Sequence, residues 1–201
     1  MSHQSLGSAL YFVSFIDDSA QKVWAYPIRT KDRVFLIFSD WLAMVENQSG
    51  QKLKCLWTDN GGEFKSEEFV KFCRERDIRR EYTEPYSPEQ NGIAECMNRT
   101  IQECVVSMLQ QSGLLDGFWA EALLTTVHII NMSPSRPLGL QIPQQLWTCS
   151  KPNYDKLRIF GCEACALLPK NDRRKLEPRS KKCIFLGYGL DGEIRYRLWD
   201  P

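Results

Sequence analysis

Two carboxylate side chains in this sequence have the type and the setting to bind a divalent metal ion. Asp59 follows an apolar, β-prone segment and precedes an Asn-Gly-Gly turn at 60–62, whose glycines allow a close approach of the backbone. Glu95 comes after 35 intervening residues, in the first turn of a long amphipathic segment. Because Mg²⁺ and Mn²⁺ prefer carboxylate oxygens, a helix packed across the strand end would let both side chains face one cation. Taken singly, Asp59 could be an ordinary turn residue, and Glu95 could merely complement the helix dipole.

The segments that must position these carboxylates alternate between strand and helix patterns. Apolar β-prone runs predict strands at 11–16, 23–28, 52–57 and 80–82, and the first two read as an antiparallel hairpin with Pro27 at an edge or bulge. Apolar residues at helical spacing predict four helices: one capped by Thr30 and ending near Gly50, one beginning at Ser66, one over 93–111 with Ile93 on its core stripe, and one over 118–131.

The composition changes after residue 132. Residues 133–156 contain four prolines and one predicted helical turn at 144–147, which is typical of a linker. Short β-like segments then follow at 158–160, 164–168, 183–186 and 195–199. Between them, residues 170–182 carry seven Lys or Arg against two acidic residues, so the nearly neutral chain contains a basic segment.

The overall composition favours a folded chain over a disordered one. The 201 residues are 43% hydrophobic and 11% aromatic, and 26 Lys and Arg balance 25 Asp and Glu. No signal peptide and no apolar run long enough for a membrane helix is visible, so we expect a soluble, intracellular α/β protein that does not bind membranes. The Cys162–Cys165 pair has the spacing of half a zinc site without a second pair nearby, and we expect no zinc there.

Several sequence blocks resemble the integrase region of copia-type (Ty1/copia) LTR retrotransposon Pol polyproteins. The blocks nearest the two carboxylates are Trp57–Phe64 (WTDNGGEF), Pro85–Glu95 (PYSPEQNGIAE) and Met97–Thr100 (MNRT). The resemblance extends over nearly the whole chain, through the blocks Phe15–Asp18, Phe118–Ala122, Asn131–Arg136, Leu157–Cys162, Pro178–Tyr188 and Tyr196–Pro201.

This resemblance implies an α/β fold in two parts. Residues 1–132 would form an RNase H-like integrase catalytic core that is N-terminally truncated, with its first strand missing. Residues 133–156 would be the Pro-rich linker, and residues 157–201 a small SH3-like β-barrel. The family's first catalytic Asp stands upstream of the segment matching 11–18, but the ten residues before Tyr11 contain no Asp or Glu. Asp17 and Asp18 match a later strand end, where turn capping is the expected role.

The resemblance also implies an activity, which is DNA integration by two-metal polynucleotidyl transfer. Asp59 and Glu95 would be the catalytic and metal-binding residues of an incomplete D,D-35-E triad. With two of three carboxylates present, we expect Mg²⁺ or Mn²⁺ to bind weakly or at one site, and the chain to be inactive alone. The expected partner is DNA, both element ends and target, with self-association as a further option. The family location is nuclear.

Candidate DNA contacts lie in three places. Arg99 is one helical turn beyond Glu95 and could reach a phosphate beside the metal site. By family position, Tyr86, Gln90 and Asn91 lie on a loop that meets DNA, although Tyr86 could equally be a packed aromatic. In the basic segment, backbone binding and an ordinary solvated loop are both open interpretations of Lys170, Arg173, Arg174, Lys175, Lys181 and Lys182.

Two other functions remain as alternatives. The chain could be a non-enzymatic DNA- or protein-binding remnant that keeps the fold and the basic segment without chemistry. It could instead be an RNase H-type nuclease that cleaves RNA in a hybrid, which the Asn-Arg-Thr block at 98–100 disfavours. His128 is alone on an apolar helix and is expected to be a core residue rather than a ligand.

Overall fold

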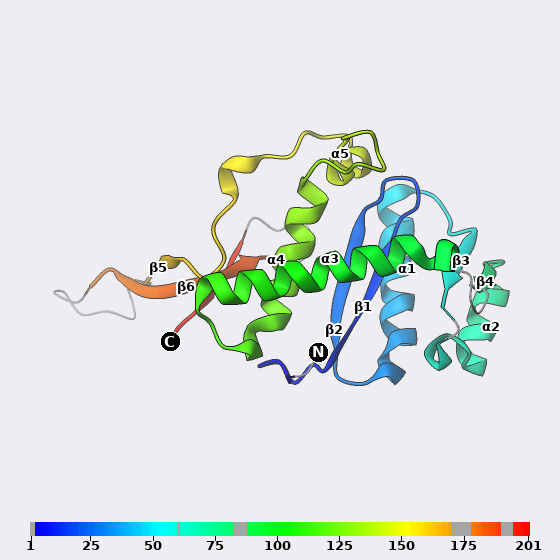
Figure 1. Cartoon of the computed structure of the whole chain (residues 1–201), viewed down its shortest axis with the longest axis horizontal. Coiled ribbons are helices and arrows are strands. Elements are labelled where there is room, and N and C mark those ends of the chain that lie inside the picture. Colours follow the sequence, from blue (N-terminus) through cyan, green and yellow to red (C-terminus); the bar gives the residue numbers. More distant parts are fainter. Residues whose placement is uncertain (1–2, 60, 83–87, 170–177, 190–194) are drawn as a thin grey trace.

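A computed structural model describes residues 3–59, 61–82, 88–169, 178–189 and 195–201, except for the side chains of 88–91. Helices and strands alternate through the first part, and a small sheet follows (Figure 1). In chain order the main elements are β1 (Tyr11–Ile16), β2 (Val23–Ile28), α1 (Val34–Ser49), β3 (Cys55–Thr58), α2 (Glu67–Glu75), β4 (Arg79–Tyr82), α3 (Pro88–Ser112), α4 (Trp119–Met132), α5 (Pro143–Thr148), β5 (Glu163–Leu167), β6 (Ser180–Tyr188) and β7 (Tyr196–Trp199). Short 3-10 turns include η1 (Lys31–Arg33) and η2 (Gly62–Phe64).

The first half of the chain contains two separate pairs of strands. β1 and β2 are antiparallel with Tyr11 opposite Ile28, whereas β3 and β4 are parallel with Cys55 opposite Arg79 and α2 as the crossover between them. Among the described residues, no strand is hydrogen-bonded to both pairs. Helices α1 and α2 join the pairs through one apolar core, whose buried residues are Val13, Phe15, Ile28, Val34, Phe38, Trp41, Leu42, Phe69, Cys73 and Ile78.

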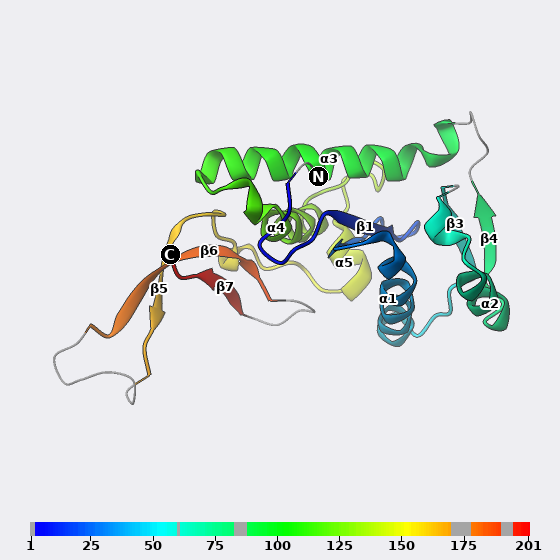
Figure 2. The ribbon, with the colours of Figure 1, turned by 90° about the horizontal axis from the view of Figure 1, so that it is seen from below.

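Helix α3 crosses over both α4 and the β1–β2 pair, as Figures 1 and 2 show from two directions. Its residues Ile101, Val105 and Leu109 are buried against α4 in a second apolar core. Nearer the start of the helix, the Ser14 hydroxyl on β1 donates to Asn98 Oδ1 at 2.7 Å. The long helix is therefore fixed at two points along its length.

The three-stranded antiparallel sheet β5-β6-β7 packs on α4 instead of standing apart from it. Phe160 and Leu186 are buried members of the same core as α3 and α4, and Trp199 packs against that core. The buried Thr125 hydroxyl donates to the Leu186 carbonyl at 2.9 Å. At Gly187, with φ of +144°, a Cβ would lie 2.4 Å from Thr125 Oγ1, so this close approach requires glycine.

Two titratable side chains of α4 also contact this sheet. Arg197 on β7 donates to Glu121 Oε1 at 2.5 Å, yet burial raises the pKa of Glu121 above its usual value because desolvation outweighs the guanidinium. The His128 ring stacks on Tyr188 with centroids 4.1 Å apart, and burial lowers the pKa of His128. The interpretation of His128 as a packed residue is consistent with this stack.

A second contact fastens α5 to the first half of the chain. The Lys22 ammonium lies 5.1 Å from the ring centre of Trp24 and 5.3 Å from that of Trp147 on α5. The Trp147 indole also donates to Gln48 Oε1 on α1 at 3.2 Å. Lys22 is largely buried, and the resulting desolvation lowers its pKa to about 8. The segment predicted as a linker is thus tied to the core by a cation–π cluster.

Most predicted elements are confirmed, and several need correction, among them β6, which begins at Ser180 and not at Cys183. The Thr30 side chain makes no cap hydrogen bond, since α1 begins four residues later after a 3-10 turn. Residues 158–160 are not a strand. Helix α3 begins at Pro88, earlier than predicted, and Ile93 is 57% exposed instead of in the core. β3 begins at Cys55, three residues later than predicted.

The remaining predictions concern the turns and the whole chain. The Ser66 hydroxyl accepts from the Phe69 amide as the cap of α2, and Gly50 ends α1 with φ of +66°. Asp17 accepts from the Ala20 amide at 2.6 Å, which confirms its turn-capping role. Within the described ranges, no helix combines the length and the apolar character needed to cross a bilayer.

Candidate active site

The Asp59 carboxylate stands directly after β3, at the edge where the two parallel strands end. Asp59 is exposed, and its Oδ1 accepts a hydrogen bond from the Gly61 amide at 3.0 Å. A carboxylate has about four lone pairs that can accept a bond, and this hydrogen bond uses one of them, so Asp59 can still bind a further ligand. The geometry agrees with the general tendency of functional groups in α/β sheets to lie at the carboxyl ends of strands.

A second carboxylate approaches Asp59 across Gly61. A Cβ placed on Gly61 would lie 2.8 Å from Asp59 Oδ1 and 2.8 Å from Glu63 Oε2, so the two side chains flank the space that the glycine leaves open. The other oxygen of Glu63 contacts the Lys31 ammonium on η1 at 3.2 Å. Sequence reasoning did not single out Glu63, and its four-residue spacing from Asp59 around two glycines is the signal that could have done so.

The turn that carries these side chains is held from the side of β4. The Arg80 guanidinium donates to the Phe64 carbonyl and also lies over the Phe69 and Tyr82 rings, with its centre 5.6 Å and 5.0 Å from the two centroids. The Phe64 ring packs edge-on against Phe69 at 5.7 Å. Phe64, at the end of η2, is therefore anchored to both β4 and α2.

Helix α3 supplies the other predicted carboxylate. Figures 1 and 2 both show the start of α3 beside the end of β3. Glu95 is exposed near this start, and Arg99 is exposed one turn later, so the two side chains share one side of the helix. Asn98, which lies between them in sequence, is turned toward Ser14 on β1. This hydrogen bond fixes the rotation of the helix, and Glu95, three residues before Asn98, lies on the adjacent part of the same face.

The donor set at this edge suits a hard divalent cation. Asp59 and Glu63 offer carboxylate oxygens next to the open space over Gly61, and this chemistry matches Mg²⁺ or Mn²⁺. In the part of the chain that the structure describes, no three His, Cys, Asp or Glu side chains form a group that could enclose a metal.

The other predicted contact residues divide into two groups. Lys181 and Lys182 are exposed on β6, where Lys181 pairs with Asp200 and Lys182 Nζ lies 2.9 Å from Glu163 Oε1. These two ammonium groups are already partnered. The side chains that fall outside the described residues are those of Tyr86, Gln90, Asn91, Lys170, Arg173, Arg174 and Lys175.

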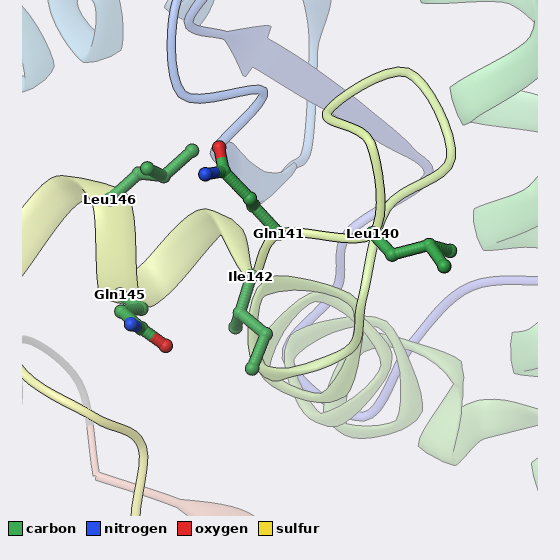
Figure 3. A pocket seen from close by; sticks show the side chains of 5 residues that line it. All are labelled: Leu140, Gln141, Ile142, Gln145 and Leu146. Carbon is green, nitrogen blue, oxygen red and sulfur yellow. The ribbon is translucent and has the colours of Figure 1, made fainter.

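A pocket of about 250 Å³ lies elsewhere, around the start of α5 (Figure 3). Its lining is formed by Leu140, Gln141, Ile142, Gln145 and Leu146. None of these five side chains is titratable or nucleophilic, so the pocket provides no group for acid–base or metal chemistry. The exposed edge at β3 and α3 remains the candidate site.

Comparison with known proteins identifies the family. Residues 3–88 match the integrase core domain, and residues 162–201 match the retroviral polymerase SH3-like domain. Over all 201 residues the chain is 50% identical to the retrovirus-related Pol polyprotein from transposon TNT 1-94 of Nicotiana tabacum. The chain belongs to the copia-type retrotransposon Pol family. Its part in that family is the integrase core region with the SH3-like domain.

One further relative and one solved structure extend the comparison. The chain is 34% identical over 186 residues, or 92% of its length, to the Pol polyprotein from transposon RE2 of Arabidopsis thaliana. It spans only 15% of the TNT 1-94 polyprotein and 13% of the RE2 polyprotein. The HTLV-2 integrase catalytic core domain, solved in complex with magnesium in a trimeric form, aligns over 66% of this chain and 80% of its own, with a TM-score of 0.50 and 19% identity. This likeness shows the RNase H-like fold.

Proposed function

We propose that this chain carries part of a DNA integrase active site, with Asp59 and Glu95 as ligands of a catalytic divalent cation. The observation that carries the proposal is the approach of the start of α3 to the end of β3, with both carboxylates exposed there. The family relationship and the magnesium in the HTLV-2 core domain support the choice of Mg²⁺ or Mn²⁺.

Each residue has a separate task in this proposal. Asp59 is oriented by its own hydrogen bond to the Gly61 amide, and Glu95 is oriented by the hydrogen bond that Asn98 receives from Ser14. Arg99, one turn after Glu95, is positioned to bind a DNA phosphate, because guanidinium groups pair with phosphate oxygens. When bound, the cation would activate the attacking oxygen and stabilise the leaving oxygen of an in-line displacement at phosphorus.

The expected affinity for metal is low. Mg²⁺ loses its water ligands reluctantly and usually needs carboxylates together with substrate phosphates to hold it. Two carboxylates therefore provide a weak, single-cation site, and we expect this chain by itself to bind DNA without completing strand transfer.

The test is a strand-transfer assay with labelled element-end DNA and Mn²⁺, together with Mn²⁺ titration of the protein. Asp59→Asn and Glu95→Gln should each weaken Mn²⁺ binding, and any strand-transfer product should vanish in Glu95→Gln. Salt-sensitive DNA binding without product, and with no loss of Mn²⁺ binding in either variant, would favour the non-enzymatic DNA-binding alternative. Cleavage of RNA in an RNA–DNA hybrid would favour the nuclease alternative.

A further inference from the structure

We propose that Glu63 is a positioning residue for the Asp59 carboxylate and that Gly61 keeps the space between them open. The inference rests on the proposed role of Asp59 in binding a divalent cation. It adds a third acidic side chain to the site and explains why the turn between β3 and η2 contains this glycine.

The geometry of Gly61 is the first step. The backbone at this residue has φ of −57° and ψ of 139°, which any amino acid adopts without strain. A glycine is therefore not required by the turn itself. An added Cβ would instead meet the ends of two side chains, since it would lie 2.8 Å from an oxygen of Asp59 and 2.8 Å from an oxygen of Glu63, and both carboxylates would have to move. Both contacts are shorter than a Cβ tolerates.

The fixed position of Glu63 is the second step. Its side chain is only 18% exposed, and one carboxylate oxygen is paired with Lys31 at 3.2 Å. Lys31 stands on η1, directly after the β1–β2 hairpin, so the ion pair connects the turn after β3 to a different part of the core. The second oxygen, Oε2, is then directed toward Asp59 across Gly61. Glu63 is held at this position rather than free to turn into solvent.

The electrostatic consequence is the third step. Two carboxylates held at short range repel each other, and a bound cation relieves this repulsion. The negative charge of Glu63 therefore increases the affinity of the Asp59 edge for a divalent cation without requiring direct coordination by Glu63. The Lys31 ammonium offsets part of this charge on the far oxygen, which leaves Oε2 as the side that faces the site.

The experiment measures Mn²⁺ binding to the folded chain by calorimetry and by paramagnetic broadening of the backbone amide signal of residue 61. Glu63→Gln should raise the Kd for Mn²⁺ by about tenfold, the effect of one unit charge at short range near a protein surface. Gly61→Ala removes no charge but should also raise the Kd, because its Cβ displaces the carboxylate oxygens of Asp59 and Glu63. Glu63→Gln keeps an oxygen for Lys31, so it removes the charge while preserving the hold on the turn. The matched controls are Gly62→Ala, where a Cβ meets nothing within 4 Å, and Glu67→Gln on the exposed first turn of α2.

The outcomes separate this inference from the proposed function. If Asp59→Asn abolishes Mn²⁺ binding while Glu63→Gln and Gly61→Ala leave the Kd unchanged, the role of Glu63 is refuted and the role of Asp59 stands. If Asp59→Asn has no effect, the proposed function fails first. A Glu63→Gln protein that loses thermal stability but binds Mn²⁺ normally would make Glu63 purely structural and overturn the inference. Should Gly61→Ala fail to fold, Glu63→Gln alone decides the question.

Discussion

Replacing Thr125 with valine tests whether α4 and the β5-β6-β7 sheet are held together by a buried polar contact. The two side chains have nearly the same shape and the same branching at Cβ, so packing and helix preference change little. The change removes the hydroxyl that donates to the Leu186 carbonyl at 2.9 Å. A β-bulge lies between Phe185 and Gly187, so Leu186 has no partner residue on β7 in the strand register. The variant therefore leaves a buried carbonyl without its side-chain donor.

The expected loss of stability comes from the Leu186 carbonyl. Thr125 is 1% exposed, and water cannot replace the lost donor without opening the contact. A buried polar group left without a partner destabilises a fold by about 1–3 kcal/mol. We expect Thr125→Val to lower the free energy of unfolding by that amount, measured by urea denaturation followed through tryptophan fluorescence.

The neighbouring residue provides the control. Thr126 is equally buried, but its hydroxyl contacts only the Met108 sulfur at 3.5 Å, and a thioether is a weak acceptor. Thr126→Val should therefore change the free energy of unfolding by less than about 0.5 kcal/mol. Equal losses in the two variants, or no loss in Thr125→Val, would refute the argument that this hydrogen bond joins the sheet to α4.

Three further predictions concern titration. Burial lowers the pKa of His128 below 6.5, so the free energy of unfolding should fall as the pH drops below that value. His128→Phe keeps a ring for stacking but cannot titrate, so this fall should be absent in the variant when both are unfolded with urea from pH 8 to pH 5. Burial raises the pKa of Glu121 above 4.5, so the folded state is most stable when Glu121 is protonated, and this stability is lost as the pH rises. The free energy of unfolding of Glu121→Gln should therefore increase relative to that of the parent between pH 4 and pH 7 in the same assay. A difference that stays constant over this range would contradict the prediction. The Lys22 side-chain NMR signal should titrate with a midpoint of about 8, against about 10 for exposed lysines, and Lys22→Arg should identify it.

Local patterns predicted those elements whose ends are fixed by nearby residues. Ser66 caps α2, and Gly50 ends α1, because each acts on a backbone within a few positions of itself. The prediction for Ile93 was wrong because α3 begins earlier than predicted, and this part of the helix extends past the core that would cover an apolar stripe. The spacing of apolar residues along the chain does not show where that core lies.

The candidate site was predicted in part for a similar reason. The identity and spacing of Asp59 and Glu95 in the sequence predict metal chemistry. Glu63 was missed, since its importance depends on the turn that brings its carboxylate back over Gly61 and on an ion pair with Lys31, which is 32 positions away. Such an ion pair between distant segments is decided by the packing of α1 against η2, which no local pattern specifies.

The close fit of Gly187 against Thr125 restricts how the chain can be recombined with its relatives. A donor segment for β5 to β7 must bring a glycine at this position and a carbonyl for the threonine, together with partners for Glu121 and His128. A chimera joined within residues 133–156 would separate these paired surfaces. Exchange of α4 together with the sheet keeps them matched, and the core between α3 and α4 then has to be matched as well.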